Sequence, residues 1–131
     1  MTVPAPLTWH ANKAVEGLMT QVAGAVAAVI STPDGFDVAS RVTTPGAGAR
    51  LAAMASSITA ICGVVGEESE IGANQSICIE AENGYVVMVH IAHPAHPMIL
   101  NLVAHKDTVL AQMVYFARVA AQNLAEQAVG A

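Results

Sequence analysis

Charged side chains are scarce in this chain of 131 residues. They make up 11% of it, against about 25% in an average soluble domain. Hydrophobic residues make up 54%. A domain of this size has a large surface for its volume, so one copy cannot hide that much apolar material inside itself. We therefore expect either a membrane location or burial of apolar surface against another chain.

Long uninterrupted hydrophobic runs are also absent. The longest, such as residues 22–30 and 85–91, hold fewer than ten residues, whereas a membrane-spanning helix needs about 20. The first residues, MTVPAPLTWHANK, lack the basic start and apolar core of a signal peptide. We expect a cytoplasmic protein without membrane insertion that forms a homo-oligomer, most simply a two-fold dimer.

Basic residues are missing from a long central stretch. No Lys or Arg occurs between Arg50 and Lys106, and the formal net charge is −5. Five glutamates fall inside that stretch: Glu67, Glu68, Glu70, Glu80 and Glu82. A protein that binds nucleic acid needs a basic surface to displace counterions from phosphates. The charge pattern therefore argues against nucleic acid as a partner.

Cysteine is nearly absent as well. Cys62 and Cys78 stand alone among apolar neighbours. Isolated thiols in a chain without a secretion signal are typical of small, reduced core residues. A disulfide between the two, or a redox role, is the alternative.

Motifs for nucleotide binding or catalysis are not found. The chain has no GxxxxGK[ST] loop and no GxGxxG after a predicted strand. No Ser–His–Asp or Cys–His set can be assigned from spacing. We expect no catalytic residues and no cofactor.

One histidine cluster, HIAHPAHP, is a candidate metal site. His90, His93 and His96 are spaced by three, and imidazole is a common zinc ligand. Residues three apart on a strand point to opposite faces, and the two prolines favour an extended loop. We expect His90 to be half-buried in a sheet and the other two to lie in a solvated loop. The spacing thus predicts no metal site.

The N-terminal part predicts a short tail, a helix and a hairpin. Residues 1–7 are expected to be a flexible tail, and residues 8–127 a single domain in which Thr8 caps the first helix. A strand is predicted over Ala25–Ser31, followed by a Pro-Asp-Gly turn and a second short strand. Asp34 in that turn has no neighbouring base or metal ligand. We interpret it as a turn residue and not as a catalytic acid.

A long helix is predicted over residues 49–65. Its large apolar residues form one stripe, which we expect to pack on the chain's own sheet: Leu51, Met54, Ile58, Ile61 and Val65. The other side carries small residues where an exposed helix normally carries charges. A small, uncharged side lets a second helix approach closely. The pattern therefore predicts a helix buried on both sides, with the small side against a partner.

The remaining elements are a second hairpin, a strand and a helix. Asn83-Gly84, a strong hairpin signal, separates the predicted strands 75–82 and 85–92. A strand over 98–104 and a helix over 108–127 follow. The predicted order is helix, two strands, helix, three strands, helix, which is an α+β fold.

These features together resemble the roadblock family of dynein-light-chain-related modules, found in bacteria as partners of small Ras-like GTPases. The resemblance rests on GAVAAVISTPDGFDVASR at 24–41, ARLAAMASSITAICGVVGEE at 49–68, ICIEAENGYVVMVHIA at 77–92 and the MILNLVA strand. It spans about residues 8–126. The loop at 93–97 departs from the family, which usually has a small or glycine-containing turn there.

The resemblance implies a profilin-like, three-layer α/β/α fold. Its five-stranded antiparallel sheet has the order 2-1-5-4-3, with the long helix on one face and the other two helices on the opposite face. It also implies a homodimer in which the long helices pair and the third strands join. The expected dimer interface is Ala49, Ala53, Ser56, Ser57, Ala60, Gly63 and Cys78. The expected partner-binding surface is Arg50, Met54, Ser57 and Ile61.

Family members have no enzymatic chemistry of their own. They act on or with a GTPase as activator, exchange factor, platform or adaptor. The resemblance thus implies a homodimeric regulator or scaffold that binds a small Ras-like GTPase. Two alternatives stay open on the residues alone: a small-molecule sensor, and a purely structural dimer in a motility or polarity assembly.

Overall fold

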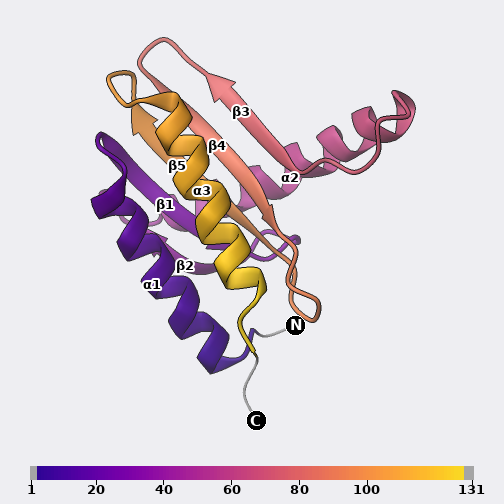
Figure 1. The fold of residues 1–131 in the computed structure, drawn as a ribbon, viewed down its shortest axis with the longest axis horizontal. Coiled ribbons are helices and arrows are strands. Elements are labelled where there is room, and N and C mark those ends of the chain that lie inside the picture. Colours follow the sequence, from indigo (N-terminus) through magenta and orange to yellow (C-terminus); the bar gives the residue numbers. More distant parts are fainter. Residues whose placement is uncertain (1–2, 129–131) are drawn as a thin grey trace.

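A five-stranded antiparallel sheet lies between two layers of helices (Figure 1). The computed structural model describes residues 3–128 of the chain. In chain order the elements are α1 (Ala5–Gln21), β1 (Ala25–Ser31), β2 (Asp37–Arg41), α2 (Ala47–Glu68), β3 (Ser76–Glu80), β4 (Gly84–Ile91), β5 (Met98–His105) and α3 (Leu110–Ala125). The strand order is β2-β1-β5-β4-β3. The predicted α+β class, element order and strand order are confirmed.

The two helical layers cover the sheet unequally. Helices α1 and α3 lie side by side on one face, α1 against β1 and β2 and α3 mainly against β4. Helix α2 crosses the other face with much lighter contacts to β1, β2 and β5. Figure 1 shows its C-terminal half projecting beyond the sheet, past β3. Much of α2 is therefore left without cover from its own chain.

The core is divided in the same unequal way. The main cluster fills the space between the sheet and helices α1 and α3, with Leu7, Leu18, Ile30, Leu100 and Met113 among its fully buried members. Within residues 3–128, the apolar cluster on the α2 side has only three buried members, Ala55, Met88 and Ile99. Burial of apolar area is the main stabilising term in folding. The α1/α3 layer thus supplies most of the stability of one chain.

The first helix begins earlier than expected. Helix α1 starts at Ala5, and Leu7, which we expected in a flexible tail, is fully buried. Pro4 is the N-cap residue, and the amide of Thr8 already donates to the Pro4 carbonyl oxygen at 3.0 Å. Pro6 suits the first turn because its missing N–H has no partner there. The predicted tail is wrong for residues 5–7, and residues 1–2 lie outside the described part.

The Pro-Asp-Gly turn joins β1 to β2 and also supports α2. Strand β1 has the predicted bounds, and Gly35 closes the turn with φ +99°. The Ser56 hydroxyl on α2 donates to the Pro33 carbonyl oxygen at 2.8 Å. A Cβ atom added at Gly35 would lie 3.4 Å from the Cβ of Ser56. The turn is a docking point for α2, and glycine allows both the backbone angle and the close approach.

The β3–β4 hairpin forms where the Asn-Gly pair predicted it, for a different reason. Its strands pair from Ser76 with Val89 to Glu80 with Tyr85. Neither Asn83 nor Gly84 has the positive φ of a two-residue hairpin turn. Instead, a Cβ atom at Gly84 would clash with the carbonyl oxygen of Ala104 on β5. Glycine is required here by close packing between strands.

Candidate functional site

The inner face of α2 is built from small residues. Its buried positions are Gly48, Ala52, Ala55, Thr59 and Gly66. Small side chains let the helix backbone approach the sheet closely. The buried Asn101 of β5 donates from Nδ2 to the Leu51 carbonyl oxygen at 3.4 Å.

The large apolar stripe of α2 therefore faces mainly outward, and our prediction that it packs on the chain's own sheet is wrong. The exposed fraction is 52% for Met54 and 65% for Ile61, and Val65 is also exposed. Leu51 and Ile58 are partly buried. Both sides of the helix are uncharged, so periodicity alone did not distinguish the inner from the outer side.

The exposed side of the helix, which we call the outer face of α2, combines both sets of predicted site residues. It consists of Ala49, Arg50, Ala53, Met54, Ser57, Ala60, Ile61, Val64 and Val65. No charged residue occurs between Arg50 and Glu67. The other two predicted helix residues lie at its margin and are partly buried: Ser56, bonded to Pro33, and Gly63. Val64 and Val65 were missed as site residues, although the same lack of charge extends to them.

Strand β3 adds a free sheet edge on the same side. In the described part of the chain it pairs with β4 alone, and Cys78 and Ile79 are exposed on it. Cys62 is partly buried on α2, and both thiols are free. The prediction that both cysteines are core residues is therefore wrong for Cys78. An edge strand presents unpaired backbone groups to which another chain can add.

The far end of β3 is held by an ion pair. Lys106 Nζ lies 2.8 Å from Glu80 Oε2 and 4.5 Å from the centre of the Tyr85 ring. The hydrogen bond between the pair lowers the pKa of Glu80 and raises the pKa of Lys106. Both side chains are exposed, so the pair adds little to stability.

A cavity adjoins the N-terminal end of the outer face. It has a volume of about 320 Å³, and its lining includes Arg50, Met54 and Val103 together with residues 42–44. Arg50 takes part in none of the ion pairs formed within residues 3–128. An unpaired guanidinium beside an apolar hollow is a suitable contact for a carboxylate or phosphate of a partner.

Helix α2 is long and apolar enough to cross a membrane by length and composition alone. Its most apolar window has a mean hydropathy of 1.5, and 22% of that window is buried in the structure. Uninterrupted apolar runs in the sequence do not reveal this, because Ser, Thr and Gly interrupt the apolar residues of the helix. Such a helix is weak evidence for a membrane, because a helix with one face on its own sheet and the other on a partner has the same composition.

The three histidines occupy different environments. His93 is only 6% exposed, which contradicts the expected solvated loop, and His96 is partly buried. His90, which we expected to be half-buried, is exposed on β4 with Nε2 3.4 Å from Asn74 Nδ2, and desolvation by the atoms around it lowers its pKa. Within residues 3–128, no three His, Cys, Asp or Glu side chains gather as metal ligands would.

The order of elements and the strand order are those of a known domain family. The sequence model of the Roadblock/LC7 domain matches residues 11–100, which is more than half of the chain. The chain belongs to the Roadblock/LC7 family. No curated protein matches it significantly.

Solved structures agree on the roadblock fold. A Roadblock/LC7 domain from Streptomyces avermitilis has a TM-score of 0.77 at 18% identity, over 86% of this chain and 92% of that one. MglB of Myxococcus xanthus has a TM-score of 0.82 at 14% identity, over 96% of this chain and 92% of that one. The gliding protein MglB of Thermus thermophilus has a TM-score of 0.80 at 18% identity, over 91% of this chain and 88% of that one. At these identities the likeness to each structure is one of fold.

Proposed function

We propose that this roadblock protein is a non-enzymatic regulator or scaffold that acts as a homodimer and binds a small Ras-like GTPase. The observation that carries the proposal is the outer face of α2, which is uncharged from residue 51 to residue 66 and uncovered by its own chain. In the roadblock family, which this chain resembles along most of its length, that helix pairs with its copy.

The homodimer is supported by the thin core on the α2 side. Within residues 3–128, the apolar cluster between α2 and the sheet has only Ala55, Met88 and Ile99 as buried members, while Met54 and Ile61 stay exposed. A second α2 packed on the first would bury these side chains at the two-fold axis. The free edge of β3, including Cys78, lies on the same side and would extend the interface. Dimer burial also accounts for the apolar α2 without a membrane.

GTPase binding is supported by the two ends of the outer face. Arg50 and Met54 border the cavity of about 320 Å³, and Ile61 lies about two turns further along α2. In a dimer these groups come from two chains and form one joint surface. Such a surface can activate a GTPase by ordering its switch loops, without inserting a catalytic arginine. It can equally hold the GTPase as a scaffold or favour nucleotide exchange.

The test is binding and GTP hydrolysis with each small Ras-like GTPase of the source organism, loaded with GDP or with a GTP analogue. We expect one GTPase to bind with a preference for one nucleotide state, and Arg50→Glu to weaken binding at least about ten-fold. Arg41→Glu, which changes an exposed arginine on β2, is the matched control and should bind normally. Absence of binding by every such GTPase, combined with a metabolite that raises the melting temperature, would replace this proposal with the sensor alternative.

A further inference from the structure

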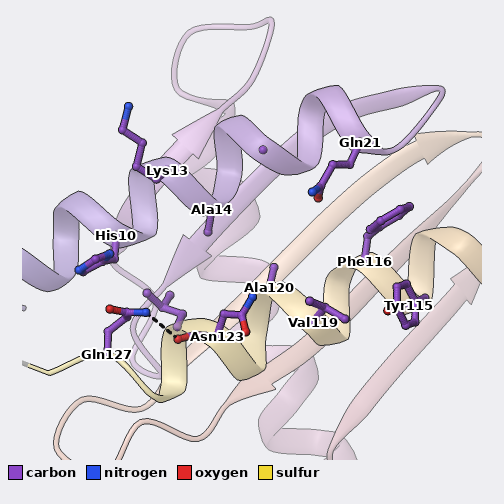
Figure 2. Close-up of a pocket in the computed structure, with 12 residues that line it drawn as sticks. His10, Lys13, Ala14, Gln21, Tyr115, Phe116, Val119, Ala120, Asn123 and Gln127 are labelled. Atoms are coloured by element: carbon purple, nitrogen blue, oxygen red, sulfur yellow. Dashed lines mark hydrogen bonds between the residues drawn. The ribbon is translucent and has the colours of Figure 1, made fainter.

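An exposed groove lies between α1 and α3, on the opposite side of the molecule from the outer face of α2 (Figure 2). Its volume is about 400 Å³. The two helices run antiparallel along it, so that His10 of α1 lies near Gln127, while Gln21 lies near Phe116 of α3. The groove is on the far face of the sheet from α2. Dimerisation through α2 would therefore leave it accessible.

The groove is kept open at its centre by Gly17. Glycine weakens the interior of a helix compared with alanine, so it usually marks a packing need. Here a Cβ atom added at Gly17 would meet nothing within 4 Å. The chain's own packing therefore gives no reason for glycine at this position. An occupant that approaches the α1 backbone closely gives one.

Aromatic residues gather around the groove although the chain has only five of them. Phe116 lies in its wall, and Tyr115, which is 62% exposed, lies beside it with ring centroids 5.5 Å apart. Trp9, the only tryptophan, does not line the groove but is 58% exposed next to His10, which does. Exposed Trp and Tyr side chains around an apolar floor are typical of protein–protein contact sites. The lining also includes three side chains with polar amides: Gln21, Asn123 and Gln127.

The charge of the groove is positive at one end in a chain whose net charge is −5. Lys13 and His10 line that end, and no Asp or Glu is among the lining residues. Lys13 Nζ lies 3.7 Å from Oε2 of Glu16. The guanidinium of Arg41 lies 3.5 Å from Oε1 of the same glutamate. These three side chains together carry one net positive charge. Glu126 precedes Gln127 but does not line the groove.

We propose that the α1–α3 groove binds an amphipathic helix of a partner protein, with apolar residues over Gly17 and Phe116 and an acidic residue beside Lys13. A groove walled by two helices accepts a third helix through residues spaced by three and four. The positive end supplies charge complementarity and fixes the direction of the bound helix. The site is separate from the outer face of α2 and does not depend on GTPase binding.

The test uses three synthetic helical peptides of about four turns. The first carries leucines at i, i+4 and i+7 and two glutamates at the end that would face Lys13, the second has lysines in place of the glutamates, and the third is scrambled. Binding to the full chain is measured by fluorescence anisotropy, and the site is mapped by amide NMR shifts. We expect the acidic peptide to bind roughly ten-fold tighter than the lysine peptide, with shifts on α1 and α3.

Two substitutions at Gly17 form a matched pair. Gly17→Ala adds a single methyl group that meets nothing in the free chain, so it should raise the melting temperature, and it should weaken peptide binding moderately because the occupant approaches the α1 backbone there. Gly17→Leu fills the groove and should weaken the binding of the acidic peptide by at least about ten-fold. Its circular dichroism spectrum should be unchanged. Lys13→Glu should reverse the preference, so that the lysine peptide binds more tightly.

Three results would overturn the proposal: equal binding of all three peptides, full binding by Gly17→Leu, or no preference change in Lys13→Glu. A further result would reassign the groove to a lipid surface, because Trp, Tyr and Lys also favour membrane interfaces. That result is binding to vesicles of phosphatidylglycerol and phosphatidylcholine, lost in Lys13→Glu, without binding of any peptide.

Discussion

The imidazole of His93 links the β4–β5 loop to the end of α3 through Gln127. His93 Nε2 lies 2.8 Å from the Gln127 carbonyl oxygen, 34 positions away in sequence. Its Nδ1 accepts the backbone N–H groups of Ala95 and His96 at 3.1 and 3.0 Å. These partners assign a neutral ring with the proton on Nε2. A side chain that we expected in solvent thus organises a loop and a helix end at once.

Replacing His93 by alanine should destabilise the fold. The change leaves two backbone N–H groups and one carbonyl without their partner in a site that is only 6% exposed. We expect the free energy of unfolding to fall by about 1–3 kcal/mol, measured by urea denaturation. His96→Ala, at a partly buried neighbour, is the control and should change it by less than about 1 kcal/mol. Equal effects of the two substitutions would contradict the role given to His93.

The histidine cluster should not bind zinc tightly. Both ring nitrogens of His93 are occupied, and His90 lies on β4, outside the His93–His96 loop. A metal ion on His93 would have to break at least one of these hydrogen bonds. We expect calorimetric titration with zinc to show no stoichiometric site. Tight binding that disappears when His93 and His96 are both changed to alanine would show the opposite.

Charges placed on the outer face of α2 should disrupt the dimer. Ala53→Glu with Ala60→Glu puts two carboxylates on each chain at the proposed interface, where they would lose water without gaining a partner. We expect the dimer to weaken at least about a hundred-fold, or the chain to aggregate, as measured by light scattering. Ala111→Glu, at an exposed position of α3, is the control and should stay dimeric. An unchanged dimer in the double variant would exclude this interface.

Stability should fall in mild acid partly because of His90. Desolvation by the atoms around it lowers its pKa in the folded chain from the usual 6.5, so near that pH the unfolded chain binds more protons. Stability therefore rises with pH in this range, and the contribution is lost as pH falls below about 6.5 towards the folded pKa. His90→Gln should reduce the loss between about pH 7 and pH 5 in thermal melts. An identical pH profile in the variant would contradict this assignment.

The sequence alone determined the type and the order of the helices and strands, although α1 begins earlier than predicted. Strand β1 has the predicted bounds because turn residues flank a short apolar run on both sides. The Pro-Asp-Gly and Asn-Gly turns placed both hairpins correctly, although only the structure showed that Gly84 is required by its contact with Ala104. The lack of charge in α2 is also read directly from the sequence, whereas burial of its outer face against a partner stays a prediction. These are local properties, or sums over local properties, and a sequence displays them directly.

The tertiary structure alone decided which face of α2 is inward, that His93 is buried, and that α1 and α3 leave a groove. Met54 and Ala55 are adjacent and both apolar, yet Met54 is exposed and Ala55 is buried. The outcome depends on how closely the helix backbone can approach the sheet, which small residues permit and periodicity does not encode. His93 is buried because the end of α3, distant in sequence, supplies a carbonyl oxygen at the right place. Contacts between distant segments arise only when the whole chain has packed, and so no local pattern foretells them.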